Sequence, residues 1–238
     1  LTPPHDISDR KITEYLPKNP VILDLMKRSY EILKDHPINQ DRIARGLNPA
    51  NSIWLWGEGT RPGVTGFEAA YGVKASVISA VDLIKGIGLC AGMKVIEVEG
   101  ATGNIDTNFK GKGEAALKTL LDGQDLVYIH VEAPDECGHH GDLEGKIQAI
   151  ERIDQDIVGP LLKGLEEAGE DYSILVMPDH PTPISIKTHI SDPIPYLLYC
   201  STDVTDSGID TYTEKTGKST GVYVEPGYLL MQQLLKNK

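Results

Sequence analysis

The stretch Leu126-Val-Tyr-Ile-His-Val-Glu-Ala-Pro-Asp-Glu-Cys-Gly-His139 is the part of the chain from which the rest is interpreted. Its first half is apolar and β-branched, which is typical of a buried strand, and we expect that strand over residues 126–133. Its second half carries Asp135 and His139 four residues apart, so one helical turn would put both side chains on one face. A carboxylate and an imidazole just beyond a buried strand stand where α/β sheets bind their ligands.

A second stretch has the same design. The run Ser173-Ile-Leu-Val-Met-Pro-Asp-His180 predicts another buried strand, over residues 173–178, that ends in the adjacent pair Asp179 and His180. His189 follows nine residues later. The two strands are therefore expected to bring two aspartates and three histidines to one edge of a sheet.

Strand and helix patterns alternate along most of the chain. Besides the two strands above, we expect strands at residues 53–57, 75–80, 94–98 and 195–199. Helices are expected from Pro20 and at residues 67–71, 81–88, 114–121, 143–166 and 227–235. The alternation predicts an α/β fold with a mostly parallel sheet and helices on both of its faces.

Three further expectations concern the borders of these elements. Gly159-Pro160 should bend or interrupt the long helix at 143–166. The polar, Gly- and Thr-rich residues 201–221 are expected to form a mobile loop. Asn48-Pro-Ala-Asn51 predicts a domain boundary, which divides the chain into residues 1–48 and 49–238.

Composition narrows the functional classes. The 238 residues carry a formal net charge of −12, whereas a nucleic-acid binder is usually basic, so we expect no nucleic-acid partner. No apolar run approaches membrane-spanning length and no signal-peptide pattern opens the chain, so we expect no membrane partner. The three cysteines include no CxxC pair, which favours the reducing cytoplasm. The chain starts with Leu1, and we expect an N-terminal part to be absent.

The aspartates and histidines have a plain interpretation and a functional one. Either the Asp135 and His139 pair or the Asp179 and His180 pair, taken alone, is most often solvated or capping. Together with His189 they form an oxygen and nitrogen donor set that suits Mn²⁺, Zn²⁺ or Mg²⁺. Five ligands are too many for one tetrahedral catalytic zinc that keeps an open position, and slightly too few for two well-held cations.

Several runs together resemble one known family. They are Ala133-Pro-Asp-Glu-Cys-Gly-His139, Pro178-Asp-His-Pro-Thr-Pro183, and His189 with Asp192-Pro-Ile-Pro195 after it. With Pro3-Pro-His-Asp-Ile7, Asn51-Ser-Ile-Trp-Leu-Trp-Gly57, Asp82-Leu-Ile-Lys-Gly-Ile-Gly88 and Gly100-Ala-Thr-Gly103, they resemble cofactor-independent phosphoglycerate mutases of the archaeal type, in the alkaline-phosphatase superfamily. The resemblance covers nearly the whole chain.

The resemblance implies an alkaline-phosphatase-like fold and a phosphotransferase with two divalent cations, Mn²⁺, Zn²⁺, Co²⁺ or Mg²⁺, and no 2,3-bisphosphoglycerate. Asp135, His139 and His189 would hold one cation. Asp179 and His180 would hold the other, together with an Asp and a nucleophilic Ser from near the family's N-terminus. That serine would carry the phosphoryl group between the 3- and 2-positions of phosphoglycerate. Residues 1–48 would be the last part of an inserted, substrate-covering domain.

The sequence departs from the family at the nucleophile. No serine in the chain lies in the family's nucleophile motif, so we expect this chain alone to be inactive. Lys85 lies where the resemblance suggests a lysine that contacts substrate phosphate, and a solvated helix residue is an equally good interpretation. Arg61, in a Gly-rich loop, could bind a carboxylate or phosphate in bidentate fashion, but a solvated side chain is the favoured interpretation.

Two competing functions remain open at this stage. The same metal site could serve a metal-dependent phosphatase or another phosphotransferase, because function depends on the substrate pocket. Alternatively the chain could be a non-enzymatic metal-binding remnant. The sequence leaves open whether the protein is a homo-oligomer.

Overall fold

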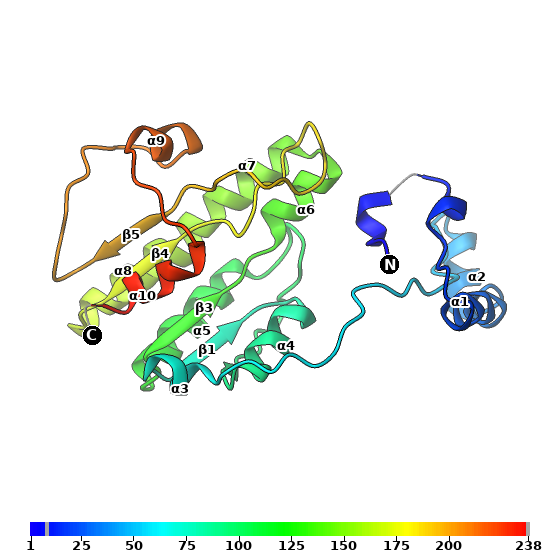
Figure 1. Ribbon diagram of the computed structural model, residues 1–238, viewed down its shortest axis with the longest axis horizontal. Helices are drawn as coiled ribbons and strands as arrows, with labels where there is room; N and C mark the ends of the chain where they lie inside the picture. The colour runs from blue at the N-terminus through cyan, green and yellow to red at the C-terminus, as the bar shows by residue number, and fades with distance from the viewer. Residues whose placement is uncertain (8–9, 237–238) are drawn as a thin grey trace. The chain divides into compact units, whose positions relative to one another are not determined.

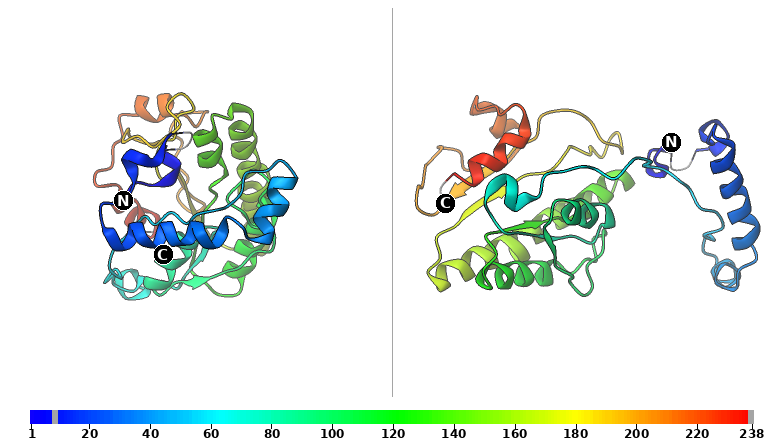
Figure 2. Two further views of the ribbon diagram at one scale, coloured as in Figure 1. Left: turned by 90° about the vertical axis from the view of Figure 1, so that its right-hand side faces the viewer. Right: turned by 60° about the horizontal axis from the view of Figure 1, so that its bottom comes forward.

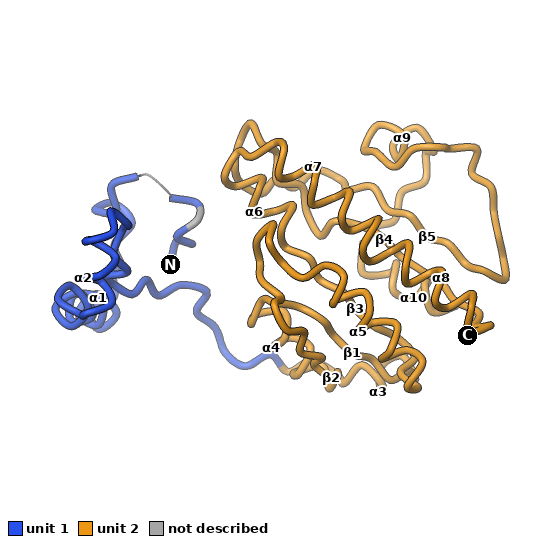
Figure 3. The backbone as a smooth tube through the Cα atoms, turned by 180° about the vertical axis from the view of Figure 1, so that it is seen from behind, with its two compact units in different colours: residues 1–62 blue, residues 63–238 orange. Residues whose placement is uncertain are grey.

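A computed structural model describes residues 1–7 and 10–236 of the chain. The chain forms two compact units, Leu1–Pro62 and Gly63–Lys238, which are coloured separately in Figure 3. The division between the two units falls after Pro62, whereas the boundary expected from the sequence follows residue 48. Hydrogen bonds tie residues 49–62 into the first unit. The amide of Ala50 donates to Asn39 Oδ1 at 2.9 Å, for example.

The described part of the first unit is helical. It contains η1 (Pro4–Ile7), η2 (Ile12–Tyr15), α1 (Pro20–Leu33) and α2 (Pro37–Ala44). Helix α1 begins at Pro20, whose missing N–H is not needed in a first turn, and Asn19 caps it by accepting from Val21 N. The strand expected at residues 53–57 is wrong, because the amide of Ile53 donates to the Ser29 hydroxyl at 3.0 Å and not to another strand.

The second unit contains a three-stranded parallel sheet in the order β2-β1-β3, of which Figure 1 labels β1 and β3. Its strands are β1 (Ala75–Ile78), β2 (Lys94–Val95) and β3 (Leu126–Ile129). All four residues of β1 are buried, as expected for the central strand of a covered parallel sheet. Strand β3 ends at Ile129, not at residue 133, because His130 makes the last bond to β1 and the chain then enters a helix at Ala133.

Two helices connect these strands. Helix α4 (Asp82–Cys90) joins β1 to β2, and helix α5 (Phe109–Leu121) joins β2 back to β3 on the other side of β1. The two crossovers run in opposite directions across the sheet. Since parallel crossovers are right-handed, they lie on opposite faces, and Figure 2 shows helices on both sides of the strands. The prediction of helices on both faces of the sheet is confirmed.

A second sheet pairs β4 (Ser173–Val176) with β5 (Leu197–Cys200) in antiparallel orientation. The loop between them, residues 177–196, carries several of the predicted ligands. Residues 201–221 were expected to form one loop. They contain a short helix, α9 (Glu214–Ser219), which Thr213 caps through a capping box. Two short C-terminal elements follow, η4 (Gly227–Leu229) and α10 (Leu230–Leu234).

The long helix expected at residues 143–166 is divided. Helix α7 (Leu143–Arg152) passes into a π-helical segment, Ile153–Val158, and then into α8 (Gly159–Ala168). The irregularity therefore precedes Gly159-Pro160, and it has the form in which π-helix usually occurs, a short interruption inside an α-helix. A Cβ added at Gly113 of α5 would lie 2.9 Å from the carbonyl of Asp156 in that segment. Ile157 of the same segment belongs to the core cluster Phe109, Ala133, Ala149 and Ile157.

Candidate metal centre

Helix α6 (Ala133–His140) carries the first two predicted ligands. It begins directly beyond β3, with Pro134 in the first turn, where its ring fits the helix. The helical spacing brings Asp135 Oδ2 to 3.4 Å from His139 Nε2. The His139 side chain is 8% exposed and that of Asp135 is 25% exposed, so the pair lies at a partly buried, solvent-accessible spot.

The loop after β4 brings two more imidazoles to the same carboxylate. His189 Nε2 lies 3.3 Å from Asp135 Oδ1, and His180 Nδ1 lies 3.9 Å from the same oxygen. The rings of His180 and His189 face each other with centroids 3.7 Å apart. One ligand atom from each of these three residues fits within 4.8 Å, which is the separation expected of groups that share a cation.

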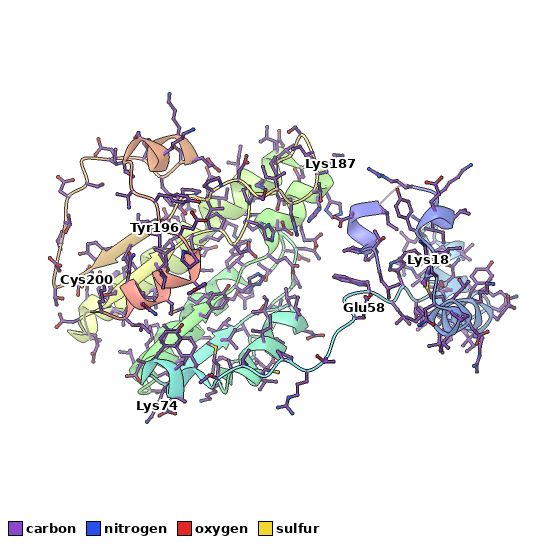
Figure 4. All side chains as sticks on the ribbon, viewed as in Figure 1. Lys18, Glu58, Lys74, Lys187, Tyr196 and Cys200 are labelled. Carbon is purple, nitrogen blue, oxygen red and sulfur yellow. The ribbon has the colours of Figure 1, made fainter. Side chains whose placement is uncertain are left out.

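His139 is oriented by the same loop. Its Nδ1 lies 3.0 Å from the carbonyl oxygen of Lys187, a residue labelled beside α6 in Figure 4. A carbonyl accepts only, so Nδ1 is the donor in this contact, and in the neutral tautomer Nε2 is then the ring nitrogen that can ligate a cation. That Nε2 lies 3.0 Å from His189 Nε2.

Asp179 lies at the rim of this cluster. Its Oδ2 is 3.3 Å from His180 Nε2, and its Oδ1 accepts a hydrogen bond from the backbone N–H of His180 at 3.0 Å. The side chain is 60% exposed. The structure therefore brings Asp135, His139, His180 and His189 together and sets Asp179 next to one of them.

Counting protons shows why these groups fit a cation. The hydroxyl of Thr182 donates to Asp135 Oδ1 and lies 3.3 Å from His180 Nδ1. Because its one proton goes to the carboxylate, His180 Nδ1 must be the donor, and in the neutral imidazole His180 Nε2 then faces the Asp179 carboxylate as a second acceptor. Acceptors that face each other repel unless a proton or a cation lies between them. Carboxylate oxygens and imidazole nitrogens suit Mn²⁺, Zn²⁺ and related divalent ions.

Of the two predicted substrate contacts, Lys85 lies in the second unit and Arg61 in the first. Lys85 of α4 donates to Glu97 Oε2 at 2.7 Å, and only 19% of the lysine side chain is exposed. Its ammonium group therefore already has a carboxylate partner.

Two titratable residues of the stretch 126–139, Glu132 and His130, were not predicted as part of the site. Glu132, Asp135 and Glu136 form a second close group of carboxylates. Burial raises the pKa of Glu132, and the charges of Glu136 and Asp135 raise it further. His130 is the first residue after β3, and its Nδ1 lies 3.2 Å from the hydroxyl of Ser79 at the end of β1.

Lys112 of α5 was also missed. It is fully buried, and its Nζ donates to the carbonyl of His130 at 3.2 Å. Burial lowers the pKa of this ammonium group, and the nearby Glu132 partly offsets the effect. Burial likewise lowers the pKa of the His130 imidazole. Lys112 precedes the helix expected at residues 114–121, and a lysine at such a position is usually interpreted as a solvated charge.

Comparison with known proteins identifies the family. The model of the Metalloenzyme superfamily matches residues 18–223, most of the chain. The chain belongs to the metalloenzyme superfamily. The match includes every predicted metal ligand and the two strands that precede them.

The most similar relatives carry one name. A 2,3-bisphosphoglycerate-independent phosphoglycerate mutase of Methanothrix thermoacetophila is 48% identical over 237 residues, covering 98% of this chain and 60% of the relative. A protein of the same name from Methanosarcina barkeri is 50% identical over 241 residues, covering 100% of this chain and 60% of the relative. The chain thus spans about 60% of the length of these relatives, and the predicted family resemblance is confirmed.

Solved structures support the fold class. The PH0037 protein of Pyrococcus horikoshii is 28% identical with a TM-score of 0.68, covering 94% of this chain and 60% of that one. A cofactor-independent phosphoglycerate mutase from Thermoplasma acidophilum, 22% identical with a TM-score of 0.54, shares the fold over 91% of this chain and 51% of that one. The predicted α/β, alkaline-phosphatase-like fold is confirmed. Among the described residues, no helix combines the length and apolar character that crossing a bilayer requires.

Proposed function

We propose that the chain is the metal-binding part of a 2,3-bisphosphoglycerate-independent phosphoglycerate mutase, which interconverts 3-phosphoglycerate and 2-phosphoglycerate. The observation that carries the proposal is the convergence of Asp135, His139, His180 and His189 from two distant segments of the chain. The names of the relatives with 48% and 50% identity support the choice of substrate.

In this proposal Asp135, His139 and His189 hold one divalent cation. Asp179 and His180 hold a second one, together with an Asp and a Ser supplied from outside these 238 residues. Bound divalent cations would neutralise charge on the phosphoryl oxygens and lower the pKa of the serine hydroxyl. Mn²⁺, Zn²⁺, Co²⁺ and Mg²⁺ are the candidate ions, and 2,3-bisphosphoglycerate is not required.

The residues of this chain have orienting roles in that chemistry. The Lys187 carbonyl keeps the proton of His139 on Nδ1, so that Nε2 stays aimed at the site. The Thr182 hydroxyl donates to Asp135 and so orients its carboxylate. Lys85 and Arg61 are proposed to bind the phosphate or carboxylate of the substrate, and Lys85 would exchange Glu97 for it.

The proposal also covers the substrate, its compartment and the course of the phosphoryl transfer. The partner is a small phosphorylated acid in the cytoplasm, with no nucleic acid and no membrane. The phosphoryl group leaves 3-phosphoglycerate for the serine oxygen and returns to the 2-hydroxyl, so no net hydrolysis occurs. Because no serine of this chain lies in the nucleophile motif, the chain by itself is expected to bind cations without turnover.

The test is an assay of the protein from its complete reading frame in the presence of Mn²⁺. Conversion of 3-phosphoglycerate should exceed hydrolysis of p-nitrophenyl phosphate, and the Asp135→Ala and His189→Ala variants should lose it. Faster hydrolysis of the generic ester would favour a phosphatase. Unchanged bound metal in both variants would favour a metal-independent role.

A further inference from the structure

Thr182 is the buried residue that joins the two ligand-bearing segments. It lies in the loop after β4 and is 4% exposed. Its hydroxyl donates to Asp135 Oδ1 on α6, and its oxygen lies 3.3 Å from Nδ1 of His180. One hydroxyl therefore contacts a proposed ligand from each segment.

The backbone of Thr182 is held from the other side. Its carbonyl oxygen accepts a hydrogen bond from Lys146 Nζ of α7 at 2.8 Å. The close approach depends on Gly138 of α6, since a Cβ there would lie 2.6 Å from the Thr182 carbonyl oxygen and 3.1 Å from Lys146 Nζ. Helix α6, helix α7 and the loop therefore meet at Thr182.

The loop around Thr182 is also closed on itself. The amide of Ile190 donates to the Pro181 carbonyl at 3.1 Å, and the amide of Lys187 donates to the Pro183 carbonyl at 2.9 Å. Lys187 has a positive φ of 59°, which is uncommon outside glycine, and its carbonyl is the partner of His139 Nδ1. A loop closed in this way transmits a shift of Thr182 to His189 and His139.

We propose that Thr182, held by Lys146, is a positioning residue that fixes Asp135, a ligand of the first proposed cation, and His180, a ligand of the second, in the geometry that binds them. The order of donors follows from the proton count: His180 Nδ1–H donates to the Thr182 oxygen, and the Thr182 hydroxyl donates to Asp135 Oδ1. The first bond leaves His180 Nε2 free to ligate, and the second leaves Asp135 Oδ2 beside His139. The inference rests on the proposed metal site.

The expected effect is that of removing a partner that orients a ligand. Such partners contribute roughly 10–100-fold to metal affinity. Thr182→Val keeps the shape and removes the hydroxyl, so Mn²⁺ affinity should fall by about that factor. Thr182→Ser retains the hydroxyl and should bind Mn²⁺ nearly as tightly as the wild-type chain. Lys146→Met should weaken binding in the same direction by a smaller factor.

The experiment is calorimetric titration of Mn²⁺ alone into the 238-residue chain and its variants. Thr119→Val is the matched control, because Thr119 is also buried, 7% exposed, and lies on α5 away from the loop. It should leave the affinity unchanged. Circular dichroism melting checks that the variants are folded. The visible absorption of bound Co²⁺ adds a reading of ligand geometry, and it should change in Thr182→Val and return in Thr182→Ser.

The outcomes separate this inference from the proposed function. If Asp135→Ala abolishes Mn²⁺ binding while Thr182→Val binds like the wild type, the metal site stands and the role of Thr182 is overturned. If Asp135→Ala leaves Mn²⁺ binding intact, the metal site itself fails. Should Thr182→Val not fold, Lys146→Met with wild-type affinity and an unaltered Co²⁺ spectrum would overturn the proposal.

Discussion

The helix α6 and the loop at residues 177–196 contribute ligands to one cluster but hold them by different means. On α6 the spacing of Asp135 and His139 follows from the backbone geometry of the helix, and both side chains are largely covered. In the loop, Asp179 and His189 are 60% and 41% exposed and have no regular backbone to place them. Their positions depend on contacts with the rest of the unit.

The loop has no regular secondary structure, so its ligands depend on more tertiary contacts than the ligands of α6 do. The loop is held by Lys146 at the Thr182 carbonyl and by the ring of contacts around Lys187. Its two ends are joined by Tyr212, whose hydroxyl lies 3.2 Å from the Val176 carbonyl and 3.0 Å from the Pro195 carbonyl. Each of these supports can be removed separately, which makes the difference between the two regions measurable.

The largest effect is expected at Asp135 of α6, which the loop histidines also contact. Asp135→Asn keeps the shape of the side chain and removes the charge that three imidazoles surround. Mn²⁺ affinity should fall by more than the roughly 100-fold that an orienting partner can cost. Calorimetry measures it, with the surface variant Asp122→Asn as control. Retained affinity in Asp135→Asn would mean that the two regions do not meet at a cation.

The contact between the two regions should be the next most sensitive point. Gly138→Ala would push a methyl group to 2.6 Å from the Thr182 carbonyl, so the helix and the loop must separate. Overpacking of this kind costs about 1–3 kcal/mol in the free energy of unfolding. Urea denaturation measures the change, and Mn²⁺ binding should weaken with it.

Gly86→Ala supplies the matched control for that substitution. Gly86 lies inside α4, and a Cβ there would meet no atom within 4 Å. Alanine should therefore stabilise the chain by about 0.5–1 kcal/mol, the usual helix preference over glycine. Equal effects of the two substitutions would show that the α6 and loop contact is not tight.

A smaller effect is expected at the exposed rim of the loop. Asp179 contacts His180 but lies outside the group formed by Asp135, His180 and His189. Asp179→Asn should lower the affinity for the first Mn²⁺ by less than about tenfold, or 1.4 kcal/mol. Calorimetry of this variant beside Asp135→Asn tests the ranking. An equal loss in both would place Asp179 at the first cation.

The smallest effect is expected at Tyr212, whose hydroxyl joins the two ends of the loop, and this effect depends on pH. Burial raises the pKa of Tyr212 to about 12. The native state therefore keeps the phenol proton while the unfolded state releases it near pH 10. The stability that this group contributes is complete below pH 10 and is lost as the pH rises towards 12. Tyr212→Phe should lose about 0.5 kcal/mol at neutral pH, the low end for a hydrogen bond, because the residue is 44% exposed.

Chemical denaturation at pH 8 and pH 11 checks the Tyr212 prediction. The difference in unfolding free energy between the wild type and Tyr212→Phe should shrink at pH 11. Tyr228→Phe is the control, since Tyr228 is 73% exposed. A difference that stays the same at both pH values would remove Tyr212 as the titrating anchor of the loop.

Much of the fold was predictable because the signals are local. The apolar runs became β1, β3 and β4, although only β1 is buried throughout, while Tyr128 of β3 is 42% exposed and β4 is half-buried. The failures have tertiary causes. Residues 53–57 look like a strand, but the Ile53 amide donates to the hydroxyl of Ser29, and none of the strands in the described part of the chain pairs with them. The π segment at Ile153–Val158 arises where α5 packs close at Gly113.

The candidate site was predictable to the extent that its residues follow strands. The aspartates and histidines were found because carboxyl ends of strands gather ligands. Thr182, Lys146 and Lys112 were missed, because a threonine or a lysine in a sequence has no mark that distinguishes a solvated side chain from a buried one. Their roles depend on partners that lie between 18 and 47 residues away along the chain.

By itself the sequence determined which residue types stand beyond each strand, and the helical spacing of Asp135 and His139, because backbone geometry repeats over a few residues. Tertiary structure alone decided that His180 and His189 reach the same carboxylate and that Thr182 joins them to α6. Those contacts depend on how a closed loop packs against α6 and α7. Packing of that kind is settled by shape and hydrogen bonding between distant segments, which local patterns do not encode.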